Sequence, residues 1–282
     1  MQTDMEDKMI RLAVWNMRFN QNKQKEKFET LAKEADIAIF IESKDIPEEI
    51  FDGLEEKFHP AFNKNDYGIR AWVRPESGIS LRSPSEEEVK EYPSVVFDSQ
   101  ETNMAVPYIV SKDGADPFLI VAVWTNHNKL DKSIAYKTLL ENIILKMQDG
   151  SRKFVLPQND YLIVGDTNLT GEGIDLKEKE VNVRNIVEQL FSENDPTRPK
   201  LLDITDGNAD EMILENGSEK TSRSTYFHTN EKWYCCDLAI ASESMDRRIR
   251  EKKIGDYKIW HKIVKGKSGS DHLPLFFQIA EK

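Results

Sequence analysis

The stretch that decides the fold reads GSDHLPLFF, residues 269–277, near the end of the 282-residue chain. It places Asp271 and His272 side by side where a hydrophobic strand is predicted to begin. An Asp-His pair in this position is uninformative by itself, because polar residues are common where strands meet turns. Its meaning depends on the side chains that other strands deliver.

The composition is that of an ordinary globular protein, with 39% hydrophobic and 32% charged residues. The length fits one large α/β domain or two small ones. No linker rich in Gly, Ser or Pro divides the chain, so we expect a single domain over residues 1–282. The apolar runs, such as FLIVAVW (118–124), are far shorter than the ~20 residues that a membrane-spanning helix needs.

The first residues and the cysteines favour a cytoplasmic protein. The N-terminal stretch MQTDMEDKMI is charged and lacks the apolar segment of a signal peptide, so export is not expected. Cys235 and Cys236 are adjacent and cannot form a relaxed bridge with each other. They indicate a reducing compartment and no disulfide framework.

Charge is distributed unevenly along the chain. The formal net charge of −11 argues against a protein that coats nucleic acid without specificity. Residues 246–268, however, contain nine Lys or Arg against three Asp or Glu. This basic run is either a solvated edge of a sheet or a patch that attracts phosphates, with Lys265 and Lys267 as the candidate phosphate contacts.

Short β-type runs alternate with helical patterns. Helical spacing of apolar residues predicts helices near 28–35, 134–147 and 183–191. Several strands are apolar on both faces, so two packed sheets with helices outside are the most economical arrangement. The predicted strands are 10–17, 36–42, 68–74, 105–111, 117–125, 160–166, 201–205, 223–229, 237–242, 256–263 and 272–279.

Polar side chains cluster where these strands begin or end. Each alone has a structural explanation as a cap, a turn residue or a loop histidine. Together they form a chemically complete set for metal-assisted attack on a phosphate ester. The set comprises Asn16, Glu42, His127, Asp166, Asn168, Asp237, Asp271 and His272.

The residue types suggest a division of labour. Mg²⁺ prefers oxygen ligands, which Glu42 and Asp271 could supply with Asn16 or water beside them. His272 suits the general base, because an imidazole with a pKa near ~6.5 can take a proton from water. A general-base imidazole needs a partner that holds its proton on one ring nitrogen and so fixes the tautomer. Asp237 is the candidate for this partner.

The remaining polar residues suit the water and the phosphate. Asp166 and Asn168 could hold the attacking water. Asn168 and His127 could donate hydrogen bonds to the phosphate oxygens as negative charge develops there. Since successive side chains of a strand point to opposite sides, we expect Asp271 to face the metal and His272 to face the water.

The sequence resembles the endonuclease/exonuclease/phosphatase superfamily, because motifs similar to that family's occur here in the same order. The resemblance implies an α/β four-layer sandwich of two packed mixed β-sheets flanked by helices, of the DNase I-like type. It also implies hydrolysis of phosphoesters with Mg²⁺ or Mn²⁺ and the roles given above, including the His272–Asp237 pair. The matching segments are VWN (14–16), FIES (40–43), YGIRAWVR (67–74), WTNH (124–127), GDTN (165–168), CDLAIAS (236–242) and GSDHLPL (269–275).

The chain also departs from the family pattern. Ile41, Thr167 and Cys236 replace the usual neighbours of predicted site residues, but no predicted ligand or base is lost. The first motif continues as MRFN, which leaves two roles open for Arg18. Arg18 either contacts a substrate phosphate or pairs with an acidic residue.

Three hypotheses describe the function. The first is a nuclease acting on DNA or RNA, with Trp233 and Tyr234 as candidate base-stacking residues and Trp260 as a core residue. The alternative is a phosphatase or phosphodiesterase acting on a small-molecule or inositol-lipid phosphoester. The third is a binding module without activity, against which the presence of the complete residue set argues.

Overall fold

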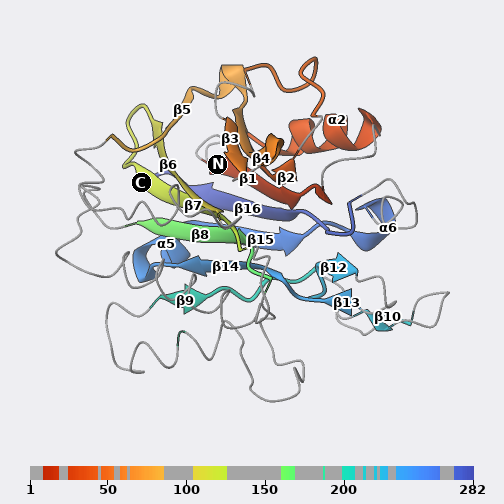
Figure 1. Cartoon of the computed structure of the whole chain (residues 1–282). Helices are drawn as coiled ribbons and strands as arrows, with labels where there is room; N and C mark the ends of the chain where they lie inside the picture. Colours follow the sequence, from red (N-terminus) through yellow and green to blue (C-terminus); the bar gives the residue numbers. More distant parts are fainter. Residues whose placement is uncertain are drawn as a thin grey trace.

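The computed structural model contains two six-stranded sheets, drawn in Figure 1. It describes residues 9–18, 25–43, 46–53, 58–61, 64–85, 104–125, 160–168, 187, 199–206, 212–213, 219–220, 223–227, 233–260 and 270–282. The first sheet has the order β15-β16-β1-β2-β4-β3 and the second the order β5-β6-β7-β8-β14-β9.

Both sheets are mixed, because β1 and β2 are parallel in the first and β7 and β8 are parallel in the second, whereas their other neighbouring strands are antiparallel. The strands of the first sheet are β1 (Met9–Asn16), β2 (Ile37–Ser43), β3 (Phe58–Ala61), β4 (Lys64–Val73), β15 (Ile249–Ile254) and β16 (Leu275–Ala280). Those of the second are β5 (Ile79–Arg82), β6 (Met104–Lys112), β7 (Phe118–Trp124), β8 (Tyr161–Asp166), β9 (Lys200–Leu201) and β14 (Asp237–Ala241).

Short elements complete the described part of the chain. Two hairpins are formed by β10 (Met212–Ile213) with β11 (Glu219–Lys220), and by β12 (Tyr226–Phe227) with β13 (Trp233–Tyr234). The helices are α2 (Lys25–Glu34), α5 (Glu243–Arg248), α6 (Tyr257–Trp260) and the 3₁₀ turn η3 (Pro75–Ser77). None of these helices is long and apolar enough to cross a membrane.

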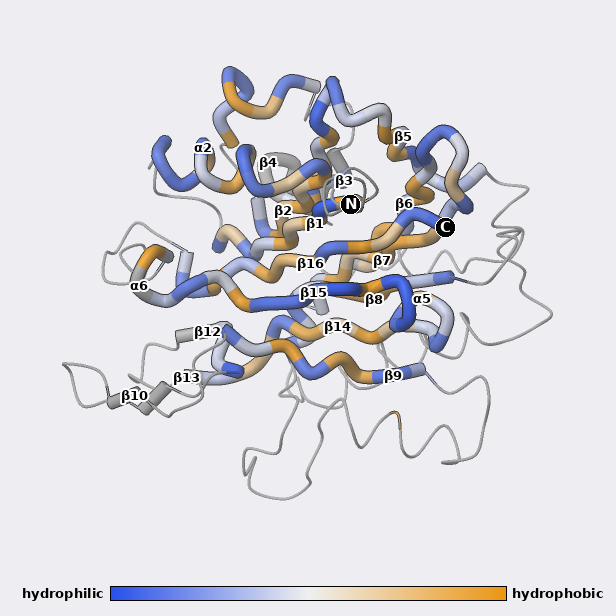
Figure 2. Tube along the Cα trace, turned by 180° about the vertical axis from the view of Figure 1, so that it is seen from behind, coloured by the Kyte–Doolittle hydropathy of each residue, from blue (hydrophilic) through white to orange (hydrophobic). Residues whose placement is uncertain are grey.

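The two sheets pack face to face, with β1 against β8 and β2 against β7. Every residue of β7 and β8 is buried, as the apolar character of both runs predicts. Figure 2 shows the hydrophobic colours concentrated along such central strands, while the edge strand β15 is largely hydrophilic. The predicted sandwich of two packed sheets is therefore confirmed.

Helix α2 covers the outer face of the first sheet. Phe28 and Leu31, two members of the predicted apolar stripe, are 1% and 0% exposed. The Phe28 ring lies 6.1 Å from that of Trp15 and 6.3 Å from that of Phe40, so it packs on β1 and β2. The helix predicted near 134–147 lies outside the described residues, as does that near 183–191 apart from Val187.

The sequence prediction was wrong for the basic run. Residues 257–260 of the predicted strand 256–263 form helix α6, and β15 lies upstream within a segment that received no strand assignment. The sequence of β15 is IREKKI, whose charges hide the strand pattern. Charged residues are common on edge strands because they discourage pairing with other chains, so the solvated-edge interpretation holds for β15.

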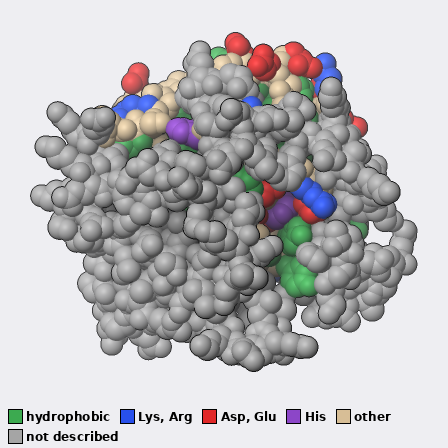
Figure 3. Space-filling view, in the orientation of Figure 1, with side chains coloured by type: hydrophobic (Ala, Val, Ile, Leu, Met, Phe, Trp, Pro, Cys, Tyr) green, Lys and Arg blue, Asp and Glu red, His purple; other side chains and the backbone are tan. Residues whose placement is uncertain are grey.

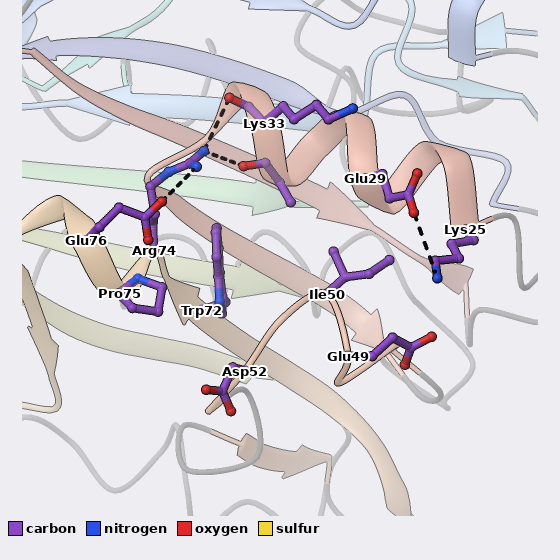
Figure 4. A pocket seen from close by; sticks show the side chains of 11 residues that line it. Lys25, Glu29, Lys33, Glu49, Ile50, Asp52, Trp72, Arg74, Pro75 and Glu76 are labelled. Atoms are coloured by element: carbon purple, nitrogen blue, oxygen red, sulfur yellow. Dashed lines mark hydrogen bonds and ion pairs between the residues drawn. The ribbon is translucent and has the colours of Figure 1, made fainter.

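The end of β4 closes a surface pocket of about 430 Å³ against α2 and residues 49–52 (Figure 4). Arg74 lies in this pocket and donates hydrogen bonds to the backbone oxygens of Lys33 and Ala35 at the end of α2. Its guanidinium also lies 3.4 Å from the carboxylate of Asp36. Cations at a helix C-terminus stabilise its unpaired carbonyls, so the charged group of Arg74 anchors α2.

Candidate active site

The topology brings the predicted polar residues to one edge of the sandwich. β1 and β2 are parallel and end at Asn16 and Ser43 at the same edge. β16 runs antiparallel to β1, so β16 begins at the edge where β1 ends. Residues 270–274, which precede β16, therefore lie at this same edge. In the second sheet, Asp166 at the end of β8 is paired with Asp237 at the start of β14. Figure 3 shows acidic, histidine and basic side chains gathered in a hollow of the surface.

His272 is held from several sides. Its Nδ1 lies 2.7 Å from Oδ2 of Asp237, as predicted, and both side chains are more than nine-tenths buried. The backbone amide of His272 donates to Ser270 Oγ at 3.0 Å, and the Trp15 indole donates to the His272 carbonyl at 2.9 Å. The ring of Tyr226 stacks at 4.5 Å from the imidazole. The imidazole therefore has a fixed orientation, with Nε2 facing away from Asp237.

Asp166 is held by two asparagines. Its Oδ2 accepts from Asn16 Nδ2 at 2.9 Å, and its Oδ1 accepts from the Asn168 backbone amide at 2.8 Å. The Asn168 side-chain amide lies 3.2 Å from Asp166 Oδ2 and donates to the Thr125 carbonyl at 2.8 Å. This network fixes Asp166 and Asn168 relative to each other, as a water-holding pair requires.

Left-handed backbone conformations concentrate at this site. Among the described residues, three non-glycine residues have positive φ, namely Arg18 at 42°, Glu42 at 50° and Asn168 at 50°. Such conformations are unfavourable for residues other than glycine and persist where the surrounding structure enforces them. All three belong to the predicted site.

The conformation of Glu42 explains how its carboxylate reaches the site. The pairing of β2 with β4 shifts register between Phe40 and Ser43, so Glu42 lies in an irregular stretch of the strand. Strict alternation would point Glu42 to the same side as Phe40, which packs on α2. A bulge re-aims a side chain, and Glu42 instead lies near Asp166, Asp271 and His272.

Asp271 has one paired and one unpaired oxygen. Its Oδ2 lies 2.8 Å from Arg18 Nη1, so the acid-pairing alternative for Arg18 is the one that the structure contains. Its Oδ1 is buried and accepts no hydrogen bond from the described residues. The expectation that Asp271 and His272 point apart is wrong, because Asp271 Oδ1 lies 3.7 Å from His272 Nε2. Both residues precede β16, so strand alternation does not apply to them.

The clustered acids disturb one another's ionisation. Burial raises the pKa of Glu42 to about 8, with further contributions from Asp166 and Asp271. Burial also raises the pKa values of Asp166 and Asp271. For His272, burial acts to lower the pKa, but Asp237, followed by Asp271 and Asp166, outweighs it and raises the pKa to about 10. The cluster thus favours bound positive charge.

A pH dependence of stability follows for the protein in EDTA. Between pH 4.5 and 8, folded Glu42 keeps a proton that the unfolded chain has lost, so the free energy of unfolding falls as pH rises. His272 acts in the same direction between pH 6.5 and 10. We expect Glu42→Gln to raise the melting temperature at pH 8 in EDTA. A lower melting temperature in EDTA at pH 8 would contradict this.

Some predicted residues lie outside the described part of the chain. These are His127, Lys265 and Lys267, together with the side chain of Trp233. Trp260 is 2% exposed and packs edge-on to Trp15 at 5.0 Å, which confirms it as a core residue.

Sequence reasoning assigned no role to two residues that support His272. Tyr226 stacks on its ring, and Ser270 Oγ donates to the Asn16 carbonyl at 2.5 Å while it accepts from the His272 amide. Ser270 was visible as the first residue of the SDH motif. Nothing near Tyr226 in the sequence indicates the long-range bridge that pairs it with His272.

Comparison with known proteins yields similarity of structure without similarity of sequence. No family model matches the chain, and no curated protein matches it. Among solved structures, the AP endonuclease LMAP from Leishmania major has a TM-score of 0.59 at 13% identity, over 100% of this chain and 91% of that one. The endonuclease domain of the telomere-specific retrotransposon TRAS1 has a TM-score of 0.56 at 14% identity, over 97% and 99%. A 3′–5′ exonuclease from Neisseria meningitidis has 0.52 at 13%, over 96% and 100%.

These likenesses extend over whole chains and identify the fold. The chain therefore shares the fold of these nucleases, which is the DNase I-like sandwich that its motifs predict.

Proposed function

We propose that this protein is a divalent-metal-dependent phosphodiesterase, and specifically a nuclease that hydrolyses DNA or RNA. The observation that carries the proposal is the buried Asp237–His272 pair at 2.7 Å, placed beside the Asp166–Asn168 network. A fixed imidazole next to a water-holding carboxylate suits proton removal from an attacking water. The solved structures with this fold include endonucleases and an exonuclease, which supports the same chemistry.

The donor set fits a hard cation such as Mg²⁺ or Mn²⁺. Glu42 and Asp271 would supply carboxylate oxygens, and Asp271 Oδ1 is buried with no hydrogen-bond partner among the described residues. Within that part of the chain, no three His, Cys, Asp or Glu side chains gather as a metal site. Two carboxylates with water and substrate oxygens are nevertheless sufficient for Mg²⁺. When bound, the ion would polarise the phosphate and lower the raised pKa of His272.

Asn16 suits a supporting role beside this set. Its Nδ2 donates to Asp166, and its Oδ1 accepts from the Arg18 backbone amide at 2.9 Å. It therefore links the water-holding carboxylate to the end of β1. Direct contact of Asn16 Oδ1 with the metal stays a prediction.

The protein's own residues would then perform the proton transfer. His272 Nδ1 donates to Asp237, which leaves Nε2 free of that partner and able to accept a proton from water. Asp166 and Asn168 would orient this water, and Asn168 with His127 would donate to the phosphate oxygens. Contacts of Lys265 and Lys267 with flanking phosphates complete the proposal.

The decisive experiment offers the purified protein supercoiled plasmid, single-stranded DNA and RNA, each with Mg²⁺, Mn²⁺ or EDTA. We expect cleavage with either ion and none in EDTA. Inositol phosphates and simple phosphodiesters are the comparison substrates. Turnover of those alone would replace the nuclease assignment by the small-molecule or lipid phosphoesterase, and no turnover of any phosphoester would refute the proposal.

A further inference from the structure

Arg18 has an unusual position at the exit of β1. Its backbone has φ 42°, and its amide donates to Asn16 Oδ1, two residues earlier, at 2.9 Å. Asn16 is itself fixed by its hydrogen bond to Asp166. The left-handed turn at Arg18 is therefore tied to the second sheet through Asn16.

This turn delivers a cation to a buried carboxylate. The Arg18 guanidinium lies 2.8 Å from Asp271 Oδ2, and the Asp271 side chain is 7% exposed. The Arg18 side chain is 46% exposed, so the guanidinium covers Asp271 from the solvent side. A surface ion pair contributes little, but a buried carboxylate without a partner is strongly unfavourable. Arg18 thus satisfies the charge of Asp271 in the protein alone.

We propose that Arg18 is an internal counter-cation that competes with the divalent metal at Asp271 and thereby sets metal affinity. The inference rests on the proposed function, because it takes Asp271 as a metal ligand. Its basis in this chain is geometric: one Asp271 oxygen is occupied by Arg18, and the other is buried with no hydrogen-bond partner among the described residues. A metal that uses this carboxylate must share it with a fixed positive charge.

The competition predicts opposite changes in two measurements. Removing the Arg18 charge leaves Asp271 unpaired and lowers the melting temperature in EDTA. It also removes the electrostatic repulsion between Arg18 and the metal ion. This repulsion should weaken metal binding about tenfold even with solvent-like screening. A merely structural role for Arg18 would lower the melting temperature and weaken metal binding together.

The test measures Mn²⁺ binding without substrate, by calorimetry or from the electron paramagnetic resonance signal of free Mn²⁺. We expect Arg18→Met and Arg18→Gln to bind Mn²⁺ about tenfold more tightly than wild type. Arg18→Lys, which keeps the charge, should bind like wild type. Arg82→Met serves as the matched control, because Arg82 is an exposed arginine on β5. The two neutral variants provide independent checks if one of them folds poorly.

The outcomes separate this inference from the proposed function. Equal or weaker Mn²⁺ binding by the neutral variants, beside normal binding by wild type, overturns the inference alone. Equally tightened binding by Arg18→Lys also overturns it, because charge would not be the cause. Absence of Mn²⁺ binding by the wild type overturns the proposed function and the inference with it.

Discussion

Replacing His272 by Ala or Gln should lower the rate of metal-dependent phosphodiester cleavage by at least about 10²-fold, the size of a general-base contribution. The imidazole is held by Asp237 on Nδ1, which fixes the position of Nε2, and the proposed metal would lower its pKa so that Nε2 can accept the proton. Gln keeps a donor for Asp237, which limits the destabilisation from leaving that carboxylate unpaired. The measurement is the initial cleavage rate at saturating Mg²⁺, with circular dichroism to verify folding.

His59→Ala is the matched control for this prediction. His59 lies on β3, where its ring packs edge-on against Tyr108 at 5.6 Å. Its loss should leave the cleavage rate within a factor of two or so of wild type, since typical effects of removing an uninvolved side chain are small. A folded His272→Gln variant that cleaves at the wild-type rate would exclude His272 as the base.

The sequence located several strand ends correctly because their limits can be read from local pattern. Asn16, Asp166 and Asp237 each adjoin an apolar run whose limits are clear, and the structure brings all three to one edge. The pairing of Asp237 with His272 followed from the residue types and the family resemblance, and it is confirmed at 2.7 Å.

What the sequence did not predict depends on contacts between distant segments. The bulge that turns Glu42 toward the site is a property of the β2–β4 register, which no local pattern specifies. The partner of Arg18 lies more than 250 residues away at Asp271, so only the fold could choose between its two roles. Residues 257–260 form a helix although their apolar content fits a strand, and Trp260 on this helix packs against Trp15, far away in the sequence.

Gly165 illustrates how tightly the sheets are fitted beneath the site, and its replacement carries the second large prediction. Gly165 has φ 141°, which residues with a side chain rarely adopt. A Cβ there would lie 2.2 Å from the Val123 carbonyl oxygen on β7 and 2.6 Å from Ile41 Cδ1 on β2. The Val123 oxygen is backbone within the buried strand β7, which pairs with β8 in the same sheet, so it cannot move aside without disturbing that pairing.

We therefore expect Gly165→Ala to lower the free energy of unfolding by about 3 kcal/mol or more, from overpacking and backbone strain together. Gly114→Ala is the matched control, because Gly114 has φ 79° but nothing within 4 Å of its added Cβ. Backbone strain alone should lower the free energy of unfolding of Gly114→Ala by about 1 kcal/mol. Urea titration of both variants measures the difference, and equal losses would show that the contact with Val123 and Ile41 contributes nothing. Because Asp166 follows Gly165 directly, Gly165→Ala should also lower the cleavage rate of the protein that remains folded.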